Sequence, residues 1–233
     1  MNACRILLPS LLWLLVSCTP PLQPDVSDAR LKPLTIPAEA RRFALVPGQS
    51  EVLILVYREG RLARLGHNHA ISARQIEGSV YLAPEFAASA VELRVPLEML
   101  EVDRPADRAR AGDEFPGELD ADAIAGTRSN MLGEEQLEAS RWPEMVLVSR
   151  ALSGADTEFE LQVDIALKDT VSRVTVPVKL TRDGSERLIA SGEFSVLQTE
   201  LGLEPFSALL GALRVRDQLD IRFRLVAEAT SGN

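Results

Sequence analysis

The stretch FELQVDIAL at residues 159–167 decides the fold. Every second residue from Phe159 to Leu167 is apolar, and polar or small residues stand between them. A two-residue period places the apolar side chains on one face of a β-strand and leaves the other face in water. The stretch VTVPVKL at residues 174–180 has the same period, although Pro177 suggests an edge position or a bulge. Together the two stretches predict a β-hairpin.

Six more segments carry strand signals. They are residues 52–57, 76–82, 91–95, 144–150, 188–198 and 219–225. Most are joined by short turns, which favours antiparallel pairing because parallel strands need long crossovers. About eight antiparallel strands, each with an apolar face, must form either a sandwich or a closed barrel. The sequence therefore predicts an all-β fold in one domain at residues 42–228, with a short tail at 229–233.

Residues 101–143 interrupt the strand pattern and are rich in charged residues. A short helix is predicted over Ser129–Ala139 and a second over Glu204–Leu213, and two such helices could close the mouths of a barrel. Three arginines lie among the acids of this segment: Arg104, Arg108 and Arg110. We expect them to form surface ion pairs of little energetic value.

The first seventeen residues resemble the signal peptide of a bacterial lipoprotein. A positive charge at Arg5 precedes an apolar run, which ends in LVSC at residues 15–18. This run is shorter than the ~20 apolar residues of a transmembrane helix. In lipoproteins the signal, here residues 1–17, is cut just before the cysteine, and Cys18 would then carry the lipid.

Residues 18–41 are rich in proline and show no apolar period, which predicts an extended tether. The residue after Cys18 is Thr19 rather than Asp. The resemblance therefore implies a lipid-anchored protein in the periplasm, on the face of the outer membrane. The alternative is an ordinary secreted protein with a chance cysteine near its cleavage site.

Composition narrows the possible partners. The formal net charge of −9 does not favour nucleic acid or anionic lipid headgroups, so no nucleic-acid partner is expected. Cys4 and Cys18 are the only cysteines, so the folded domain has neither a disulfide nor a cysteine metal site. The sequence contains no GxSxG, Walker or GxGxxG motif, and we predict no cofactor and no catalysis.

Four stretches in order resemble the YceI-like family, a periplasmic group with a lipocalin-like β-barrel. They are Leu65–Ile71 with Ile76–Val80; Val95–Leu97 with Asp103, Met131-Leu132, Leu137 and Trp142-Pro143; Leu161–Leu167 with Val174–Leu180; and Phe194–Gln198 with Leu201-Gly202-Leu203. The acidic insertion around Asp107–Asp122 and an aromatic content of 5% depart from the family pattern. The resemblance implies a single antiparallel barrel of about eight strands that binds a long apolar molecule, such as an isoprenoid quinone, a polyprenyl chain or a fatty amide.

The strand alternation assigns eight apolar residues to the barrel interior as candidate ligand contacts. They are Leu93, Val95, Phe159, Leu161, Val163, Ile165, Ile221 and Phe223. An eight-stranded barrel either fills its own interior or holds one small ligand, and periodicity does not distinguish the two.

The two histidines, His67 and His69, are spaced to share one face of a strand. Three roles are open to them: a structural role at the barrel mouth, contact with a ligand headgroup, or binding of Zn²⁺ or Cu²⁺. A metal site would need further ligands, such as Asp103, Asp107 or Asp113.

The favoured hypothesis is a membrane-anchored, non-catalytic carrier of an apolar ligand. One alternative is a metal-binding protein or metal-dependent enzyme that uses His67 and His69. Another is an interaction module whose acidic segment 101–143 meets a basic partner. The sequence leaves the oligomeric state open.

Overall fold

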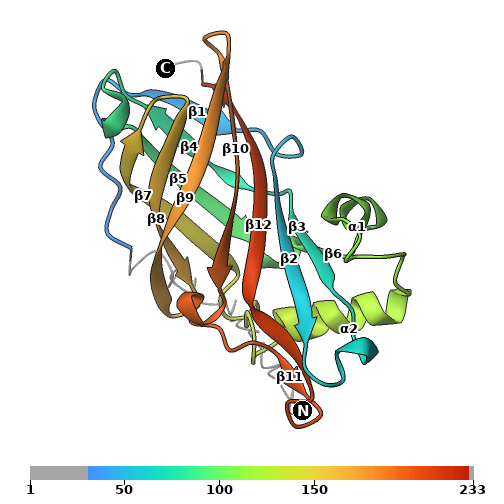
Figure 1. The fold of residues 1–233 in the computed structure, drawn as a ribbon. Helices are drawn as coiled ribbons and strands as arrows, with labels where there is room; N and C mark the ends of the chain where they lie inside the picture. Colours follow the sequence, from blue (N-terminus) through green and yellow to red (C-terminus); the bar gives the residue numbers. More distant parts are fainter. Residues whose placement is uncertain (1–30, 231–233) are drawn as a thin grey trace, which may run out of the picture.

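The computed structural model describes residues 31–230 (Figure 1). The predicted signal, Cys18 and the first part of the tether lie outside the described residues. The strands are β1 (Arg41–Leu45), β2 (Glu51–Glu59), β3 (His69–Ala73), β4 (Glu77–Leu82), β5 (Ala90–Pro96), β6 (Glu101–Val102), β7 (Glu144–Gly154), β8 (Glu158–Leu167), β9 (Thr170–Asp183), β10 (Arg187–Leu197), β11 (Ser207–Ala208) and β12 (Leu213–Ala229). The helices are α1 (Pro105–Ala111) and α2 (Ala121–Leu132).

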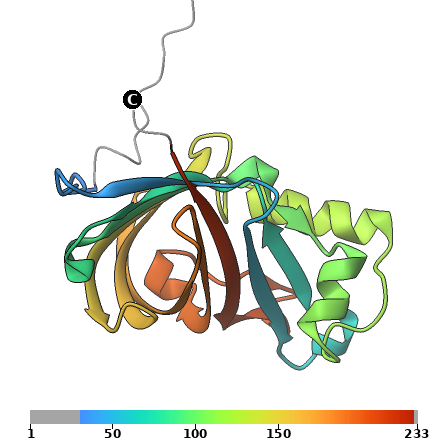
Figure 2. The same cartoon turned by 90° about the horizontal axis from the view of Figure 1, so that it is seen from above.

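Eight of these strands form an antiparallel barrel, in the order β1-β4-β5-β7-β8-β9-β10-β12 (Figures 1 and 2). The ring closes where β1 pairs with the end of β12, Phe43 opposite Ala229. The first part of β12 pairs instead with β2, which continues the sheet to β3 and β6. The predicted all-β barrel is confirmed, and we call the space inside the eight strands the lumen.

All eight predicted strands are present, but one of them lies outside the ring. Residues 52–57 belong to β2, which flanks the barrel, and the ring is completed by β1, which the sequence analysis did not identify. Both strands pair with β12, because its 17 residues are long enough to hold two partners in succession.

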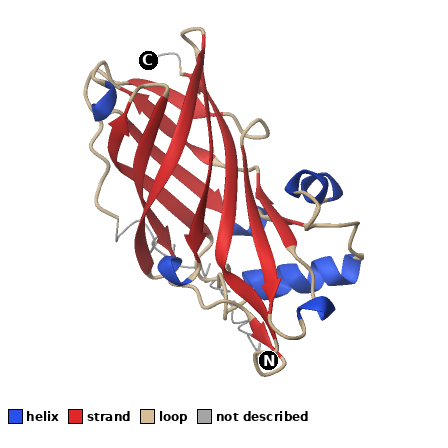
Figure 3. Ribbon diagram, in the orientation of Figure 1, coloured by secondary structure: helices blue, strands red, loops and turns tan. Residues whose placement is uncertain are grey.

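Both predicted helices need correction (Figure 3). Helix α2 covers residues 121–132 rather than 129–139, because the Asp120 carboxylate accepts a 2.8 Å hydrogen bond from the Ala123 amide and caps the helix earlier. Residues 204–213 form no helix. Ser207 and Ala208 pair with the start of β12, so this segment is a hairpin.

The two helices cover different surfaces of the sheet. Helix α1 and the loop after it lie on the outer face of β2 and β3, where Ala111 and Phe115 pack with Leu55 and Tyr57. Helix α2 lies next to β6, and its Met131 and Leu132 pack against the apolar cluster of the lumen. Much of segment 101–143 is therefore part of the packed domain.

The chain from residue 31 onward packs on the outside of the barrel. Leu31 and Leu34 contact an apolar cluster of Val146, Val148 and Ala166. The Arg150 guanidinium donates a 2.8 Å hydrogen bond to the carbonyl of Lys32. Residues 31–34 of the predicted tether are thus packed against the barrel.

Candidate ligand-binding lumen

The predicted interior residues lie on the inner face of the barrel. Val95, Val163, Ile165 and Ile221 are buried in one apolar cluster, and Leu93 and Leu161 pack against it. The other two, Phe159 and Phe223, line a pocket on the barrel wall. The position of these eight residues agrees with the alternation, and their contact with a ligand stays a prediction.

Part of the inner face of the barrel is reached by solvent. Several inner-face residues near β9 and β10 are only partly buried, among them Leu161, Val174, Val176 and Phe194. Apolar side chains that faced a fully packed interior would be excluded from water. Their exposure means that packed side chains do not fully close this side of the lumen.

The hydrogen-bond ladder between β9 and β10 covers only part of the two strands. Residues 179–183 of β9 pair with residues 187–191 of β10. The rest of β9, which begins at Thr170, and the rest of β10, which continues to Leu197, do not pair with each other. Pro177 lies just beyond the paired part, where its missing N–H breaks no ladder hydrogen bond to β10. β9 is not an edge strand, because it lies between β8 and β10, but Pro177 lies outside the stretch that pairs with β10. We call the unpaired stretch of these two strands the seam.

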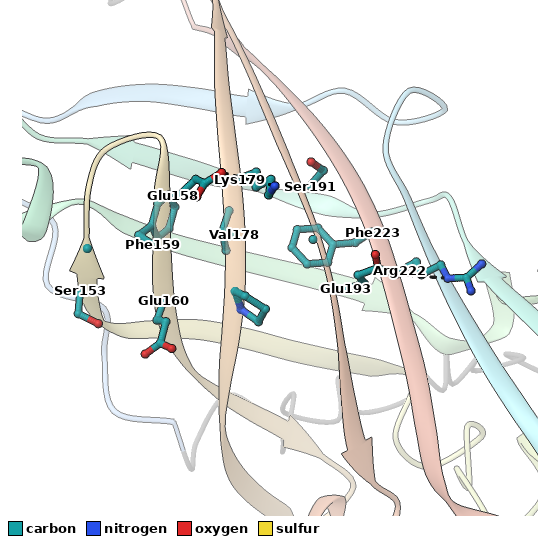
Figure 4. Close-up of a pocket in the computed structure, with 13 residues that line it drawn as sticks. Ser153, Glu158, Phe159, Glu160, Val178, Lys179, Ser191, Glu193, Arg222 and Phe223 are labelled. Atoms are coloured by element: carbon teal, nitrogen blue, oxygen red, sulfur yellow. Dashed lines mark ion pairs between the residues drawn. The ribbon is translucent and has the colours of Figure 1, made fainter.

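A pocket of about 730 Å³ lies where the paired part ends (Figure 4). Its lining includes Val178 and Phe223 from the inner face, and Lys179 and Glu193 from the outer face. The pocket thus lies on the barrel wall where residues of both faces come together. The seam places partly exposed inner-face residues next to the protein surface.

Two features shape this pocket. A Cβ atom on Gly192 would overlap the Pro177 carbonyl oxygen and lie 2.8 Å from the Phe223 ring, so only glycine fits where β9, β10 and this ring come together. Charged pairs lie at the outer rim, with Lys179 Nζ 3.4 Å from Glu158 Oε1. A second pocket of about 560 Å³, lined by residues including Val174 and Ser195, continues along the seam.

The histidines do not share a strand face. His69 is the first residue of β3 and lies opposite Val56, whereas His67 lies in the preceding loop and is exposed. Their ring centroids are 6.4 Å apart. Among residues 31–230 no group of three or more His, Cys, Asp or Glu side chains is placed to hold a metal ion. Metal binding by His67 and His69 stays a prediction, and the geometry adds no support to it.

His69 is oriented by a buried carboxylate. Its Nδ1 lies 2.6 Å from Asp103 Oδ2, and Asp103 Oδ1 accepts a 2.9 Å hydrogen bond from the Ala70 amide. Burial raises the pKa of Asp103, but the hydrogen bonds from His69 and the Ala70 amide outweigh burial and hold this pKa below its ordinary value. The His69 Nε2 atom makes no hydrogen bond within the described residues and is available to another group.

Arg108 is not the surface arginine that the sequence predicted. Its side chain is 3% exposed and donates a 2.8 Å hydrogen bond to the fully buried Asp103. It also donates to the backbone carbonyls of Asn68, Pro116 and Gly117. Arg108 thus ties the loop after α1 to the start of β3. Arg104 does fit the expectation, because it is exposed and, among residues 31–230, forms an ion pair with Glu101 alone.

A second ionic cluster fastens α1 to the sheet. The buried Asp107 accepts hydrogen bonds from Arg74, Arg110 and Ser72. Burial raises the pKa of Asp107, but these partners together lower it to about 2. Arg110 is half-exposed and pairs at 2.6 Å both with Glu51 and with the buried Asp107. The predicted surface ion pair is therefore also wrong for Arg110, because one of its partners is buried.

Replacing Asp107 with Asn is expected to remove part of the acid sensitivity of folding. A carboxylate whose pKa is lowered by folding stabilises the protein above its unfolded pKa, near 3.8. That contribution, roughly 2 kcal/mol, is lost as the pH falls toward 2. Urea unfolding from pH 7 to pH 2 should show a wild-type advantage that shrinks below pH 4. An advantage that is constant with pH would contradict the role given to Asp107.

The sequence analysis missed the seam and the ionic clusters. Pro177 was a usable signal for the seam, because it marks an unpaired strand side. Arg74 lies more than 30 residues before Asp107 in the chain, and no local pattern in the sequence indicated the hydrogen bond between them.

Comparisons with known proteins agree with this fold. The sequence profile of the YceI-like domain matches residues 44–227. BcnA of Burkholderia cenocepacia superposes with a TM-score of 0.56 at 16% identity, covering 78% of this chain and 98% of BcnA. A polyisoprenoid-binding domain from Saccharophagus degradans, implicated in plant cell wall breakdown, gives 0.56 at 11% identity, covering 81% and 98%. No curated protein sequence matches the chain.

Proposed function

This chain belongs to the YceI-like family, and we propose that it binds one long apolar molecule, of isoprenoid or fatty-amide type, in the lumen without transforming it. The observation that carries the proposal is the apolar inner face of the barrel, part of which stays exposed to solvent beside the seam. An eight-stranded barrel has room for one small ligand. Each methylene that leaves water contributes ~0.8 kcal/mol, so a long chain gains affinity from apolar walls alone.

The polar end of the ligand has a suitable contact in His69. The buried Asp103 fixes the Nδ1 side of the ring and leaves Nε2 for a headgroup. The similarity to a polyisoprenoid-binding domain supports an isoprenoid ligand in particular. Binding of this kind needs neither a cofactor nor a reacting side chain.

We place the protein at a membrane, held by lipid on Cys18 and facing the periplasm. The signal-like residues 1–18 support this part of the proposal. Within residues 31–230 no helix has the length and hydrophobicity needed to cross a bilayer. The anchor would keep the carrier close to the membrane that supplies or receives its ligand.

Titration with a fluorescent polyene fatty acid tests the proposal. We expect saturable enhancement at one probe per chain, and displacement of the probe by an isoprenoid quinone or a long fatty amide. Comparing the two competitors at equal chain length identifies the ligand class. Failure of the probe and of both competitors to bind would overturn the proposal.

A further inference from the structure

The hairpin between β11 and β12 exposes two adjacent leucines at its tip. Leu209 is 59% exposed and Leu210 is fully exposed, which is unusual for large apolar side chains at neighbouring positions. Both have positive φ angles, 52° and 55°, a conformation that costs energy for residues other than glycine. The fold thus accepts backbone strain in a turn that holds two leucines in water.

A second loop joins this hairpin at the same end of the molecule (Figure 1). The Leu62 amide donates a 2.8 Å hydrogen bond to the Ala212 carbonyl, so the loop after β2 is fastened to the hairpin. This loop carries Leu65, which is 59% exposed. We call Leu65, Leu209 and Leu210, with the two loops that carry them, the apolar tip.

The apolar tip is flanked by positive charge, although the whole chain has a net charge of −9. Arg61 and Arg64 lie in the same loop as Leu65 and are exposed. Neither forms an ion pair with any residue in the range 31–230, whereas the nearby Arg214 is neutralised by Glu59. Two free guanidinium groups beside three exposed leucines match the chemistry of an anionic bilayer surface.

A bilayer fits the apolar tip better than a protein partner does. A stable protein interface buries about 1,000 Å² or more, and three leucines on two protruding turns offer far less. A membrane needs only a few side chains to enter its interface. If Cys18 carries lipid, the 13 residues from there to Leu31 span at most ~45 Å, which keeps the domain within reach of the membrane.

We propose that the apolar tip inserts into the headgroup region of an anionic membrane, with Arg61 and Arg64 against the lipid phosphates. This contact goes beyond ligand binding in the lumen and does not depend on it. It holds the domain in one orientation, with the end that carries α2 and the loop after β2 toward the bilayer.

A local fluorescent probe tests this contact in the full chain. Cys4 and Cys18 are the only cysteines, so replacing both with Ser allows a single Leu209→Cys to carry an environment-sensitive dye. The matched control is Ser185→Cys, an exposed site in the β9–β10 hairpin. Every variant keeps the apolar signal segment, so any binding to vesicles through that segment is common to all of them, and the local probe separates the two sites.

With vesicles of phosphatidylcholine and phosphatidylglycerol, the dye at position 209 should shift to the blue and be quenched by spin-labelled lipid. The dye at 185 should stay in water. Adding Leu210→Asp should abolish the shift, and Arg61→Glu with Arg64→Glu should weaken the response to anionic vesicles roughly tenfold or more. No shift at 209, or equal shifts at 209 and 185, would overturn the proposal.

Discussion

Replacing Val176 with Trp is expected to weaken ligand binding by roughly 50-fold. Val176 lies on the inner face of β9 beside the seam and is only partly buried, opposite Leu161 on β8. An indole at this position would occupy the space of about three ligand methylenes, each worth ~0.8 kcal/mol. The titration with the polyene probe measures the loss directly.

Thr175→Trp is the matched control for this experiment. Thr175 is the neighbouring residue on the same strand, but it is exposed on the outer face. The same large side chain there should leave the affinity unchanged within about twofold, and both variants should unfold near the wild-type temperature. Equal losses of affinity in the two variants would show that the ligand does not bind in the lumen.

Replacing Arg108 with Ala is expected to lower the free energy of unfolding by about 3–5 kcal/mol. The change leaves the fully buried Asp103 without its guanidinium partner and removes the donor for three backbone carbonyls. Urea unfolding at neutral pH measures the effect.

Arg104→Ala serves as the control in the same helix region. The Arg104 side chain is 44% exposed and, within the described part of the chain, pairs with the half-exposed Glu101 alone, so its loss should cost less than about 1 kcal/mol. Equal stability of the two alanine variants would contradict the claim that the buried Arg108–Asp103 pair stabilises the loop after α1.

Alternation in the sequence predicted the long barrel strands because each has one face in water. The hairpin of β8 and β9 is the clearest case, and the four β8 residues assigned to the interior, Phe159, Leu161, Val163 and Ile165, share the face that the two-residue period predicted. β1 was missed because its five residues, RRFAL, are too few to show a period. The false helix at 204–213 arose because Leu209, Leu210 and Leu213 happen to stand at helical spacing, whereas two of them project into solvent from a strained turn.

The candidate site was only partly predictable for a different reason. Which face of a strand points inward follows from neighbouring residues, so the lumen lining could be inferred. Whether the lumen is filled depends on where β9 and β10 stop pairing, and that is set by contacts between strands. Likewise, Arg108 and Arg104 look alike in sequence, and only the tertiary fold buries one of them.

The most direct test of ligand binding in the lumen is native mass spectrometry of the chain purified without added lipid, followed by organic extraction. We expect one bound apolar molecule per chain, with a mass that matches the species in the extract. Val176→Trp should carry less of it than Thr175→Trp. A ligand-free mass that persists after addition of isoprenoid quinones and long fatty amides would contradict a ligand-binding lumen.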